Sequence, residues 1–597
     1  MSADPGNCDV IVVGAGPVGS TAALLLRSYG VTTTVVERRV EPQRHPAAHV
    51  LSTRSVEIWR EIGLEREIRR RSAPLSELRT ILYCTTVAGP ELGRVPLMDL
   101  PPERLDAIES VSPTRAVHLP QSELEELLWA QLEESDQIDF HTGWSYESHA
   151  TDDDGVAVTV ADLRTGQRKT LRAGYLIGAD GAASAVRTAL GVAMVGPVLQ
   201  HMISVHFSAD LEQFRRNRRG PVIWTHTPRG VGTIIVHHPP DDLVFQTPYF
   251  PPLQSLLDFT TPVCQRRILE AIGDRSVSVE VKSVRSWAMT AQVAATYRFG
   301  RVFLAGDAAH RFPPTGGLGL NTGIADVHNL AWKLAWVRAS HADAALLDTY
   351  DLERRPVAVA ATSDAVANFD GLLDVLAALG ISRRAARHLP ALAARLPGWL
   401  PRRALGAVLA GVSVLGFQRL RLASAPGVIG RRVRRRARAA IARQGPHYHS
   451  WGRDLGVCYR RGAVIAERSA EPESDPQFYT PRLRAGARLP HTWILDNGHR
   501  VTTLDLLSRD QLTLLVGTAQ RALWQAAAAH LPVRLRTIDD SAFWSGEAND
   551  AHADAVVVRP DGHVVALLWA AGDSGAQLRA ALAAVSVPVP VAQGRTA

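Results

Sequence analysis

The chain contains 597 residues, of which 46% are hydrophobic and 21% charged, so it can bury a sizeable core and is neither disordered nor fibrous. Its 66 basic and 59 acidic residues give a formal net charge of +7, which by itself hints at an anionic partner. Four cysteines lie far apart with no CxxC pair, which excludes a disulfide scaffold or a zinc ribbon and favours a reducing compartment.

Neither a leader sequence nor a membrane span is evident. The N-terminus has no positively charged segment ahead of an apolar run, so we expect no signal peptide and a cytoplasmic location. The apolar stretch from Ala404 to Phe417 is shorter than the ~20 residues that a membrane-spanning helix needs. We expect it to form a packed or dimer-interface helix, in a monomer or homodimer.

The first forty residues predict a strand, a turn, a helix and a second strand. Val10 to Val13 is a short continuous apolar run, typical of a parallel strand buried on both faces. The turn Gly14-Ala15-Gly16-Pro17-Val18-Gly19 follows it, and an Ala/Leu-rich helix is expected over Ser20 to Tyr29. Thr32 to Val36 is rich in β-branched residues and predicts a strand that ends at Glu37.

In this setting the glycine turn predicts a dinucleotide site. Gly14 permits the tight turn, Gly16 lets the backbone approach a pyrophosphate, and Gly19 allows the helix to pack closely on the strand. The pyrophosphate would lie at the helix N-terminus. Glu37 would accept a hydrogen bond from a ribose hydroxyl, which favours FAD or NAD over NADP at this site.

Further along, a helix and two β-rich stretches are expected. Ser122 to Glu134 predicts a helix that starts with a capping box of Ser122 and Glu125. Strand patterns then lead to Asp180-Gly181, which is either a loop that closely approaches a ligand or a simple strand–turn–helix connection. A second β-rich stretch runs from about Met202 to Val284.

The segment from Arg301 to Gly323 is the most specific motif in the chain. A buried strand leads to Gly306-Asp307, whose carboxylate is suited to a ribityl or ribose hydroxyl. Two prolines and three glycines follow, and a helix is expected to start near Asn321. A flat ring lying edge-on to that helix start would meet free N–H groups and the positive end of the helix dipole.

The remainder of the chain changes character twice. After about residue 365 it becomes rich in Ala, Leu and Arg, and seven arginines fall between Arg431 and Arg443, which accounts for the net charge. No recognition motif for nucleic acid accompanies them, so we expect a solvated helix face. A turn-rich linker near 466–482 precedes an αβ unit with strands at 511–517 and 533–539, a hairpin at 555–569 and a helix at 574–585.

Taken together, the glycine turn with Glu37, the Asp180-Gly181 motif and the Arg301–Gly323 segment resemble those of the class A FAD-dependent aromatic hydroxylases. The likeness is closest to the phenol-hydroxylase-like branch, which includes tailoring oxygenases of aromatic polyketides. It implies an α/β fold with a Rossmann-like, GR2-type FAD-binding domain and no metal site. The implied division is FAD binding at 1–80, 110–190 and 290–370, a β-sheet substrate domain at 81–109 and 191–289, a helical segment at 371–465 and a thioredoxin-like domain at 480–597.

Residue by residue, the resemblance implies a non-covalent FAD site. Arg44 lies where the family often contacts NADPH, and Pro313 to Asn321 would line the isoalloxazine, with Pro313 and Asn321 closest to the chemistry. The implied cofactor-binding residues are Gly14, Gly16, Pro17, Gly19, Glu37, Arg38, Arg44, Arg115, Gln121, Asp180, Gly181, Gly306, Asp307, Pro313, Gly316, Gly319, Leu320 and Asn321.

The resemblance also implies a reaction. NADPH or NADH, bound transiently, would reduce FAD, and O₂ would form a flavin C4a-hydroperoxide that transfers OH to an electron-rich ring. His49 stands where phenol hydroxylases carry an aspartate, so it is either a catalytic base or a histidine hydrogen-bonded beside the flavin. In the second β-rich stretch, the aromatic and histidine side chains suited to a flat substrate are Trp224, His226, His237, Tyr249 and Trp287, with Arg285 as a further candidate.

Two alternatives remain open at this point. The same scaffold supports Baeyer–Villiger oxygen insertion, which would give a lactone or ester instead of a ring hydroxyl. A non-catalytic protein that binds flavin and sequesters an unstable intermediate would share the three motifs. Flavin-dependent halogenation is disfavoured because the chain contains no WxWxIP-like segment.

Overall fold

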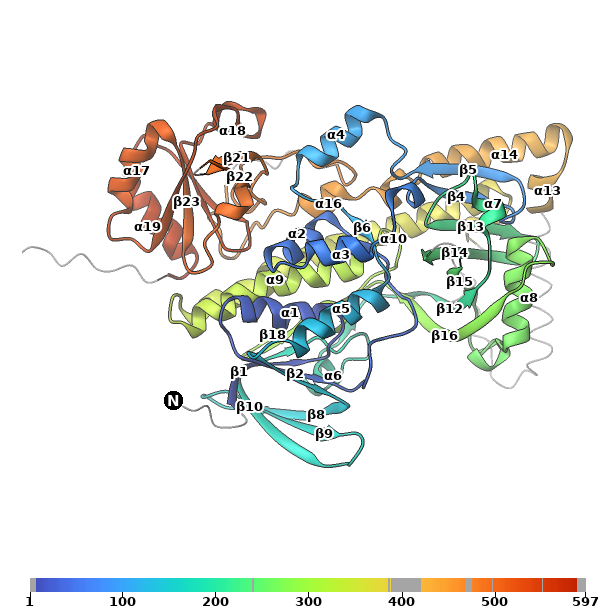
Figure 1. The fold of residues 1–597 in the computed structure, drawn as a ribbon, viewed down its shortest axis with the longest axis horizontal. Helices are drawn as coiled ribbons and strands as arrows, with labels where there is room; N and C mark the ends of the chain where they lie inside the picture. The colour runs from blue at the N-terminus through green and yellow to red at the C-terminus, as the bar shows by residue number, and fades with distance from the viewer. Residues whose placement is uncertain are drawn as a thin grey trace, which may run out of the picture.

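The computed structural model describes residues 7–238, 241–384, 387, 420–467, 475–496, 498–549 and 551–587. Three larger sheets organise these residues, each packed against its own hydrophobic cluster. Figure 1 shows the long helix α9 running between the N-terminal sheet and the C-terminal αβ unit. The stretch from Ala404 to Phe417, for which a packed helix is expected, lies outside the described residues.

The N-terminal sheet is formed mainly by parallel strands with apolar side chains on both faces. Its order is β18-β19-β10-β1-β2-β7, at Arg298–Phe299, Val302–Leu304, Arg168–Gly178, Asn7–Val13, Thr33–Glu37 and Ile138–Thr142. Figure 1 shows helices on one face of this sheet and a hairpin on the other. The helices are α1, α5 and α9 (Pro17–Ser28, Gln121–Glu133, Leu318–Arg338), and the hairpin is β8 and β9 (Trp144–Thr151, Val156–Asp162).

Two helices begin earlier than the sequence patterns indicate. The helix α1 starts at Pro17 instead of Ser20, because proline has the φ of a first helical residue and needs no N–H partner there. The helix α9 starts at Leu318 instead of near Asn321. Its N-cap, Gly317, has a φ of 64°, a left-handed conformation that glycine adopts without steric cost.

The capping box expected at the start of α5 does not form. The helix begins after Pro120, and no side chain caps it, so the Ser122–Glu125 prediction is wrong. Glu125 is buried and instead accepts hydrogen bonds from Arg39 Nη1 (2.7 Å) and Gln43 N (3.0 Å). A hydrogen bond from a cation stabilises a buried carboxylate more than one from a helix N-terminus, whose N–H groups water can also solvate.

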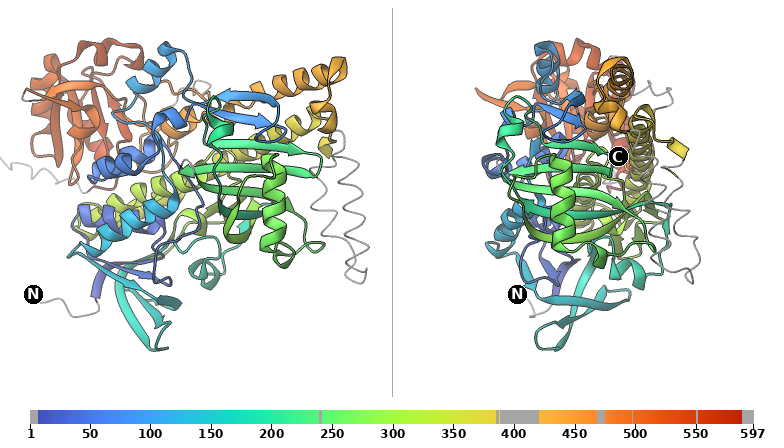
Figure 2. Two further views of the ribbon diagram at one scale, coloured as in Figure 1. Left: turned by 45° about the vertical axis from the view of Figure 1, so that its right-hand side comes forward. Right: turned by 90° about the vertical axis from the view of Figure 1, so that its right-hand side faces the viewer.

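The central sheet has seven strands in the order β16-β12-β15-β14-β13-β4-β5. They span Glu280–Thr290, Val198–Ser208, Asp242–Tyr249, Gly230–His238, Val222–Thr227, Thr80–Cys84 and Glu91–Pro96. Side chains on one face pack with α8 (Thr261–Ile272) in a hydrophobic cluster, and Figure 2 shows this helix lying across the sheet. Alternate side chains point to the opposite face, which lines a cavity.

Helices from several parts of the chain surround these sheets. They include α2, α3, α4 and α6 (Thr53–Glu61, Glu65–Arg71, Pro102–Ser110, Ala185–Ala189) and α10, α13, α15 and α16 (Thr349–Ala378, Arg421–Ser424, Gly445–Tyr448, Trp451–Leu455). The arginine run lies on α14 (Gly427–Ala442), which packs through Ala437, Ala440 and Ile441. Arg431, Arg432, Arg435 and Arg436 are exposed, as expected of a solvated helix face.

The C-terminal unit follows the pattern expected from its sequence. Its sheet order is β24-β23-β25-β26, at Val533–Ile538, Leu512–Gly517, Ala555–Val558 and Val564–Leu568. The parallel strands β23 and β24 are joined by α17 (Arg521–Ala528), and the β25–β26 hairpin is followed by α19 (Ser574–Ala584). A separate hairpin of β21 and β22 (Trp493–Asp496, His499–Thr502) and the short α18 (Ser541–Ser545) complete it.

A buried ionic cluster joins this unit to α9 and α10. Glu353 on α10 accepts hydrogen bonds from Lys333 Nζ and Arg559 Nη1, both at 2.8 Å, and from Asn329 Nδ2 at 2.6 Å. Arg559 also pairs with Asp561. The charged side chains in this cluster are almost completely buried, so their charges are compensated by one another and not by water.

Over the described ranges, no helix combines the length and the apolar character that a membrane span requires. Those same ranges contain no group of three or more side chains placed to bind a metal ion.

Candidate active site

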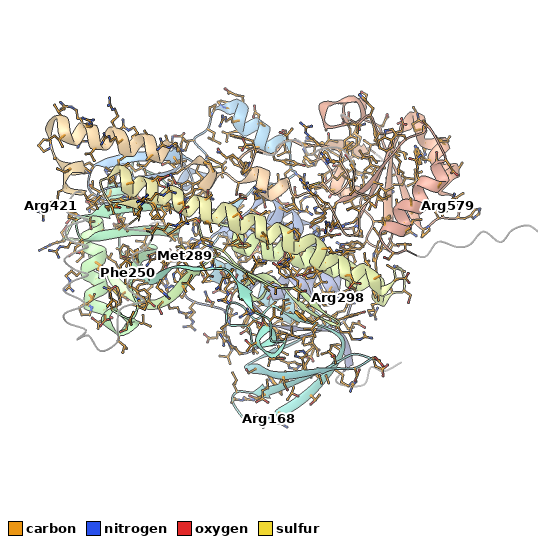
Figure 3. The ribbon with its side chains drawn as sticks, turned by 180° about the vertical axis from the view of Figure 1, so that it is seen from behind. Arg168, Phe250, Met289, Arg298, Arg421 and Arg579 are labelled. Atoms are coloured by element: carbon orange, nitrogen blue, oxygen red, sulfur yellow. The ribbon has the colours of Figure 1, made fainter. Side chains whose placement is uncertain are left out.

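A cavity of about 1520 Å³ lies between the N-terminal and central sheets. The glycine turn after β1 forms one end, and the loop from Pro313 to Leu320 borders the middle. The inner face of the central sheet forms the other end, where Phe250 and Met289, labelled in Figure 3, contribute to the wall. Each of the three sequence motifs therefore contributes residues to one continuous cavity.

The three glycines of the first turn differ in what surrounds them. A Cβ on Gly14 would lie 2.5 Å from the Ala179 carbonyl oxygen, and one on Gly19 would lie 1.9 Å from the Gly14 oxygen. Gly14 also has a φ of 100°. A Cβ on Gly16 would meet nothing within 4 Å, because this residue faces the cavity at the N-terminus of α1. Gly14 and Gly19 hold the turn, and Gly16 leaves room for an anion at the helix N-terminus.

Glu37 faces the cavity and also braces the glycine turn. Its Oε2 accepts a hydrogen bond from Ala15 N (2.8 Å), and its Oε1 accepts from Arg39 N (2.9 Å) and Nε (3.1 Å). Arg39 links Glu37 to Glu125, and all three line the cavity. The sequence did not predict that Arg39 and Glu125 contribute to this site. The one signal in the sequence was the position of Glu125 on the apolar side of its helix.

Two aspartates predicted to contact a cofactor have different surroundings. Asp180 lines the cavity, but its carboxylate accepts hydrogen bonds from Ser184 Oγ (2.5 Å) and Ala185 N (2.6 Å) at the start of α6. The carboxylate of Asp307 projects into the cavity and has no hydrogen-bond partner among the described residues. Desolvation by the surrounding protein raises the pKa of Asp307, and His310 and Arg311 partly offset this effect. A ligand hydroxyl would satisfy this carboxylate.

The loop before α9 is held from behind by Asn321. Its Oδ1 accepts hydrogen bonds from Ser52 N (2.9 Å) and Ser55 Oγ (2.8 Å), and its Nδ2 donates to the carbonyls of Val50 (3.1 Å) and Gly317 (2.7 Å). Asn321 is therefore saturated and does not line the cavity, which departs from its expected place beside the reacting ring. Pro313, Gly316, Gly319 and Leu320 do line the cavity.

The remaining predicted cofactor residues divide into two groups. Pro17, Arg38, Arg115, Gln121 and Gly181 line the cavity. Arg44 does not, because its side chain is 83% exposed and pairs with Glu41. Gly306 also lies outside the lining, since a Cβ there would come within 2.9 Å of Val18. It serves the packing of α1 against the loop.

The inner face of the central sheet presents one polar row within an apolar wall. The strand register places Arg285, Ser204, Gln246, Thr233 and Trp224 side by side on five successive strands. All five line the cavity. No ion pair of Arg285 and no side-chain hydrogen bond of Gln246 or Thr233 occurs within the described part of the chain. The row therefore offers a cation and two neutral polar groups to a ligand.

Of the predicted substrate residues, the structure brings Trp224 and Trp287 to the cavity. Trp224 Nε1 donates to the Tyr448 hydroxyl (2.7 Å), which fixes the indole. Tyr249 packs in the hydrophobic cluster on the opposite face of the sheet, because it lies one residue out of phase with the lining positions. His226 and His237 are buried behind the cavity wall and do not line it.

His49 lines the cavity beside the loop. Its neighbour Val50 would lie 3.5 Å from a Cβ built on Gly317. The Nδ1 atoms of His49 and His118 are 3.1 Å apart, and His118 Nε2 lies 2.9 Å from the Val236 carbonyl oxygen. Burial lowers the pKa of His118 to about 4 and that of His49 well below its usual 6.5, so both rings are neutral at pH 7.

Comparison with known proteins agrees with this geometry. Residues 7–365 match the family described as "FAD binding domain", and residues 482–586 match "Aromatic-ring hydroxylase, C-terminal". The chain is 32% identical to 2,4-dichlorophenol 6-monooxygenase of Delftia acidovorans, covering 96% of this chain and 97% of that protein. It is 33% identical to a putative polyketide hydroxylase of Streptomyces halstedii, with coverages of 93% and 92%. The crystal structure of the flavin-dependent monooxygenase PieE with FAD and substrate superposes with a TM-score of 0.84 at 32% identity, covering 97% and 99%.

Proposed function

Because this chain belongs to the FAD-dependent aromatic-ring hydroxylases, we propose that it uses NAD(P)H and O₂ to hydroxylate a phenolic or polycyclic aromatic substrate. The observation that carries the proposal is the single cavity, which runs from the glycine turn, past the Pro313–Leu320 loop, to an aromatic and polar sheet wall. A cofactor held at the first two features would present its ring to a substrate held at the third.

The residues present fit FAD. The open space at Gly16 and the N-terminus of α1 suit the pyrophosphate, and the unpartnered Asp307 suits a ribityl or ribose hydroxyl. The backbone of the loop before α9 suits the flat ring. When bound, the flavin supplies electron transfer from NAD(P)H and the activation of O₂. We propose that the nicotinamide cofactor binds transiently, since the sequence contains one glycine turn of this kind.

A substrate larger than phenol fits the dimensions. Ligand pockets commonly measure about 300–1,000 Å³, and this cavity of about 1520 Å³ has room for a cofactor ring and several fused substrate rings. Trp224 and Trp287 offer flat apolar contacts, and Arg285, Gln246 and Thr233 offer groups that orient ring oxygens. The likeness to a putative polyketide hydroxylase supports the same substrate class.

The protein's own residues contribute orientation, exclusion of water and a proton acceptor. Attack on an aromatic ring is easier when its hydroxyl is losing a proton, so a base near that hydroxyl accelerates the reaction. We propose His49 as this base. It is neutral at pH 7, because burial lowers its pKa, and it lines the cavity beside the loop that suits the flavin.

The test measures turnover under ¹⁸O₂ with the FAD-loaded enzyme and NADPH, with 2,4-dichlorophenol and 1-naphthol as probes. We expect each probe to accelerate NADPH oxidation and to acquire one labelled ring hydroxyl. A labelled lactone or ester would point instead to Baeyer–Villiger insertion. If the flavin is bound but no phenol accelerates NADPH oxidation, the protein is a flavin-binding protein without this activity, and the proposal fails.

We also propose the finer features of the architecture. The β23–α17–β24 unit followed by the β25–β26 hairpin and α19 supports a thioredoxin-like C-terminal domain. The separate hydrophobic clusters support the domain division stated above, with the FAD-binding domain in three segments. A cytoplasmic location and a monomeric or homodimeric state remain proposals that fractionation and light scattering test.

A further inference from the structure

We propose that His118 acts as a positioning residue that fixes the tautomer of His49, so that Nε2 of His49 is the atom that accepts the substrate proton. This inference rests on the proposed function, and it adds the residue that makes His49 competent as a base. His118 lies on β6 (Val117–His118), 69 residues from His49 along the chain. The cavity lining includes both histidines.

The tautomers follow from one hydrogen bond. His118 Nε2 lies 2.9 Å from the Val236 carbonyl oxygen, and a carbonyl oxygen only accepts, so the proton of His118 is on Nε2. A neutral imidazole has a single N–H, so Nδ1 of His118 carries a lone pair. His49 Nδ1, 3.1 Å away, must then donate. Its own Nε2 is left as a bare acceptor.

The argument requires both rings to be neutral, and the surroundings provide this. Burial lowers the pKa of both histidines, and the proximity of His118 lowers the pKa of His49 further. His237, on β14, lies 5.4 Å from His49 between ring centroids, and its pKa is also well below the usual value. Beyond this ring lie His206, which contacts Asp242, and His238, which contacts Glu123.

Hydrogen bonds to the backbone of His49 and of the next residue hold His49 in place. The short strands β3 (Val50–Leu51) and β6 pair Val50 with His118, and the backbone oxygen of His49 accepts from Leu119 N at 2.9 Å. On the other side, the Val50 carbonyl accepts from Asn321 at the start of α9. These bonds locate His49 between the loop and the central sheet, where the hydroxyl of a bound phenol is expected.

The proton balance is complete within the pair. The O–H bond of the phenol breaks, its electron pair stays on oxygen, and the proton binds to Nε2 of His49. His49 then becomes a cation whose Nδ1–H still donates to Nδ1 of His118, and His118 stays neutral and keeps its hydrogen bond to Val236. The nitrogens of His237 have no hydrogen-bond partner among the described residues, so this ring contributes packing and not a path for the proton.

The test combines a tautomer measurement with a pH profile. The first measurement uses FAD-loaded protein labelled with ¹⁵N-histidine. The nitrogen chemical shifts of His49, assigned by comparison with the His49→Phe variant, report which ring nitrogen carries hydrogen, and no turnover is needed. In parallel, 2,4-dichlorophenol turnover is measured from about pH 6.5, where this phenol is largely un-ionised, to about pH 9, where it is ionised. The variants are His49→Phe, His118→Phe, His118→Asn, which keeps an acceptor for His49, and His499→Asn on the exposed β22 as a control.

In the wild-type protein we expect His49 to carry its hydrogen on Nδ1 and a lone pair on Nε2. In the His118→Phe variant, we expect part of the population to carry the hydrogen on Nε2 instead. At the lower pH, His49→Phe is expected to lose about 100-fold in kcat, the lower end of a general-base contribution. We expect His118→Phe to lose about tenfold, part of that contribution, and His118→Asn and His499→Asn to stay within about twofold. Both phenylalanine variants recover as pH rises, because ionised substrate needs no base.

Two results would overturn the inference. One is a His49 ring whose proton is on Nε2 in the wild-type protein. The other is an equal loss of kcat in His118→Phe and His118→Asn at every pH. If His118 had only a structural role, an acceptor at this position would make no difference, and raising the pH would not restore kcat. If no phenol is turned over by any variant, the proposed function fails instead, and the nitrogen shifts alone decide the tautomer.

Discussion

Replacing Glu353 with glutamine is expected to lower the free energy of unfolding by about 3–5 kcal/mol, the cost of leaving buried cations without their partner. Glu353 accepts hydrogen bonds from Lys333, Arg559 and Asn329, and both cations are almost completely buried. The amide keeps the shape of the side chain but removes its charge. Asp561 then remains the carboxylate paired with Arg559.

The pKa of Glu353 gives a second measure of the same effect. Burial alone would raise this pKa, but Arg559 and Lys333 outweigh burial and hold it at about 2. Relative to the usual 4.5, this difference corresponds to about 3 kcal/mol at neutral pH. Because the folded-state pKa is lowered, the stabilisation is fully present above pH 4.5 and disappears as the pH falls toward 2.

The assay is chemical unfolding of the FAD-loaded protein, followed by tryptophan fluorescence. Trp332 is a suitable reporter, because it is buried beside Arg559 and Lys333. The matched control is Glu147→Gln, which breaks an exposed pair with Arg168 and should cost less than about 1 kcal/mol. A Glu353→Gln penalty no larger than the control, or one that does not shrink between pH 4.5 and 2, would refute the reasoning.

Three further predictions concern the cavity. Gly19→Ala is expected to prevent folding, because its Cβ would lie 1.9 Å from the Gly14 oxygen, and the yield of soluble protein measures this. Gly16→Ala should fold but bind FAD weakly, which flavin fluorescence measures. Asp307→Asn should raise the Kd for FAD about tenfold or more in a fluorescence titration, since a hydrogen bond to a charged group is worth about 1.5–3 kcal/mol; unchanged affinity would contradict its assigned role. Burial raises the pKa of Asp454 to about 6 although Ser52 and Arg54 N donate to it, so the contribution of Asp454 to native stability is greatest below pH 3.8 and is lost as the pH rises through 6. Asp454→Asn should therefore be more stable than wild type by about 3 kcal/mol at pH 8 and by less than about 1 kcal/mol at pH 4, as paired unfolding curves will show.

Features that depend on a short stretch of chain were predictable from the sequence. The turn from Gly14 to Gly19 and the strand ending at Glu37 combine local steric requirements with a local apolar pattern, and both are present in the structure. The loop from Pro313 was predictable for the same reason. Family membership followed because these local motifs occur in a specific order, and the comparisons confirm it.

Features that depend on distant contacts were not predictable. Glu125 has the right spacing for a capping box, yet Arg39, 86 residues away, binds it more strongly than a helix end does. Asn321 looked suited to the reacting ring, but Ser52 and Val50 use its hydrogen-bonding capacity. The phase of Tyr249 depends on strand register, which a sequence pattern without a marked turn leaves undetermined.

The alternation along the central strands has a consequence for how such enzymes diverge. Gln246 and Pro248 face the cavity, while Phe245 and Tyr249 on either side of them pack with α8 in a separate core. Substitutions at the cavity-facing positions reshape the wall without disturbing that core or the glycine turn at the other end. Substrate range is therefore free to drift during evolution while the machinery for oxygen chemistry stays constant, and a library confined to these alternate positions samples new substrates at low cost in stability.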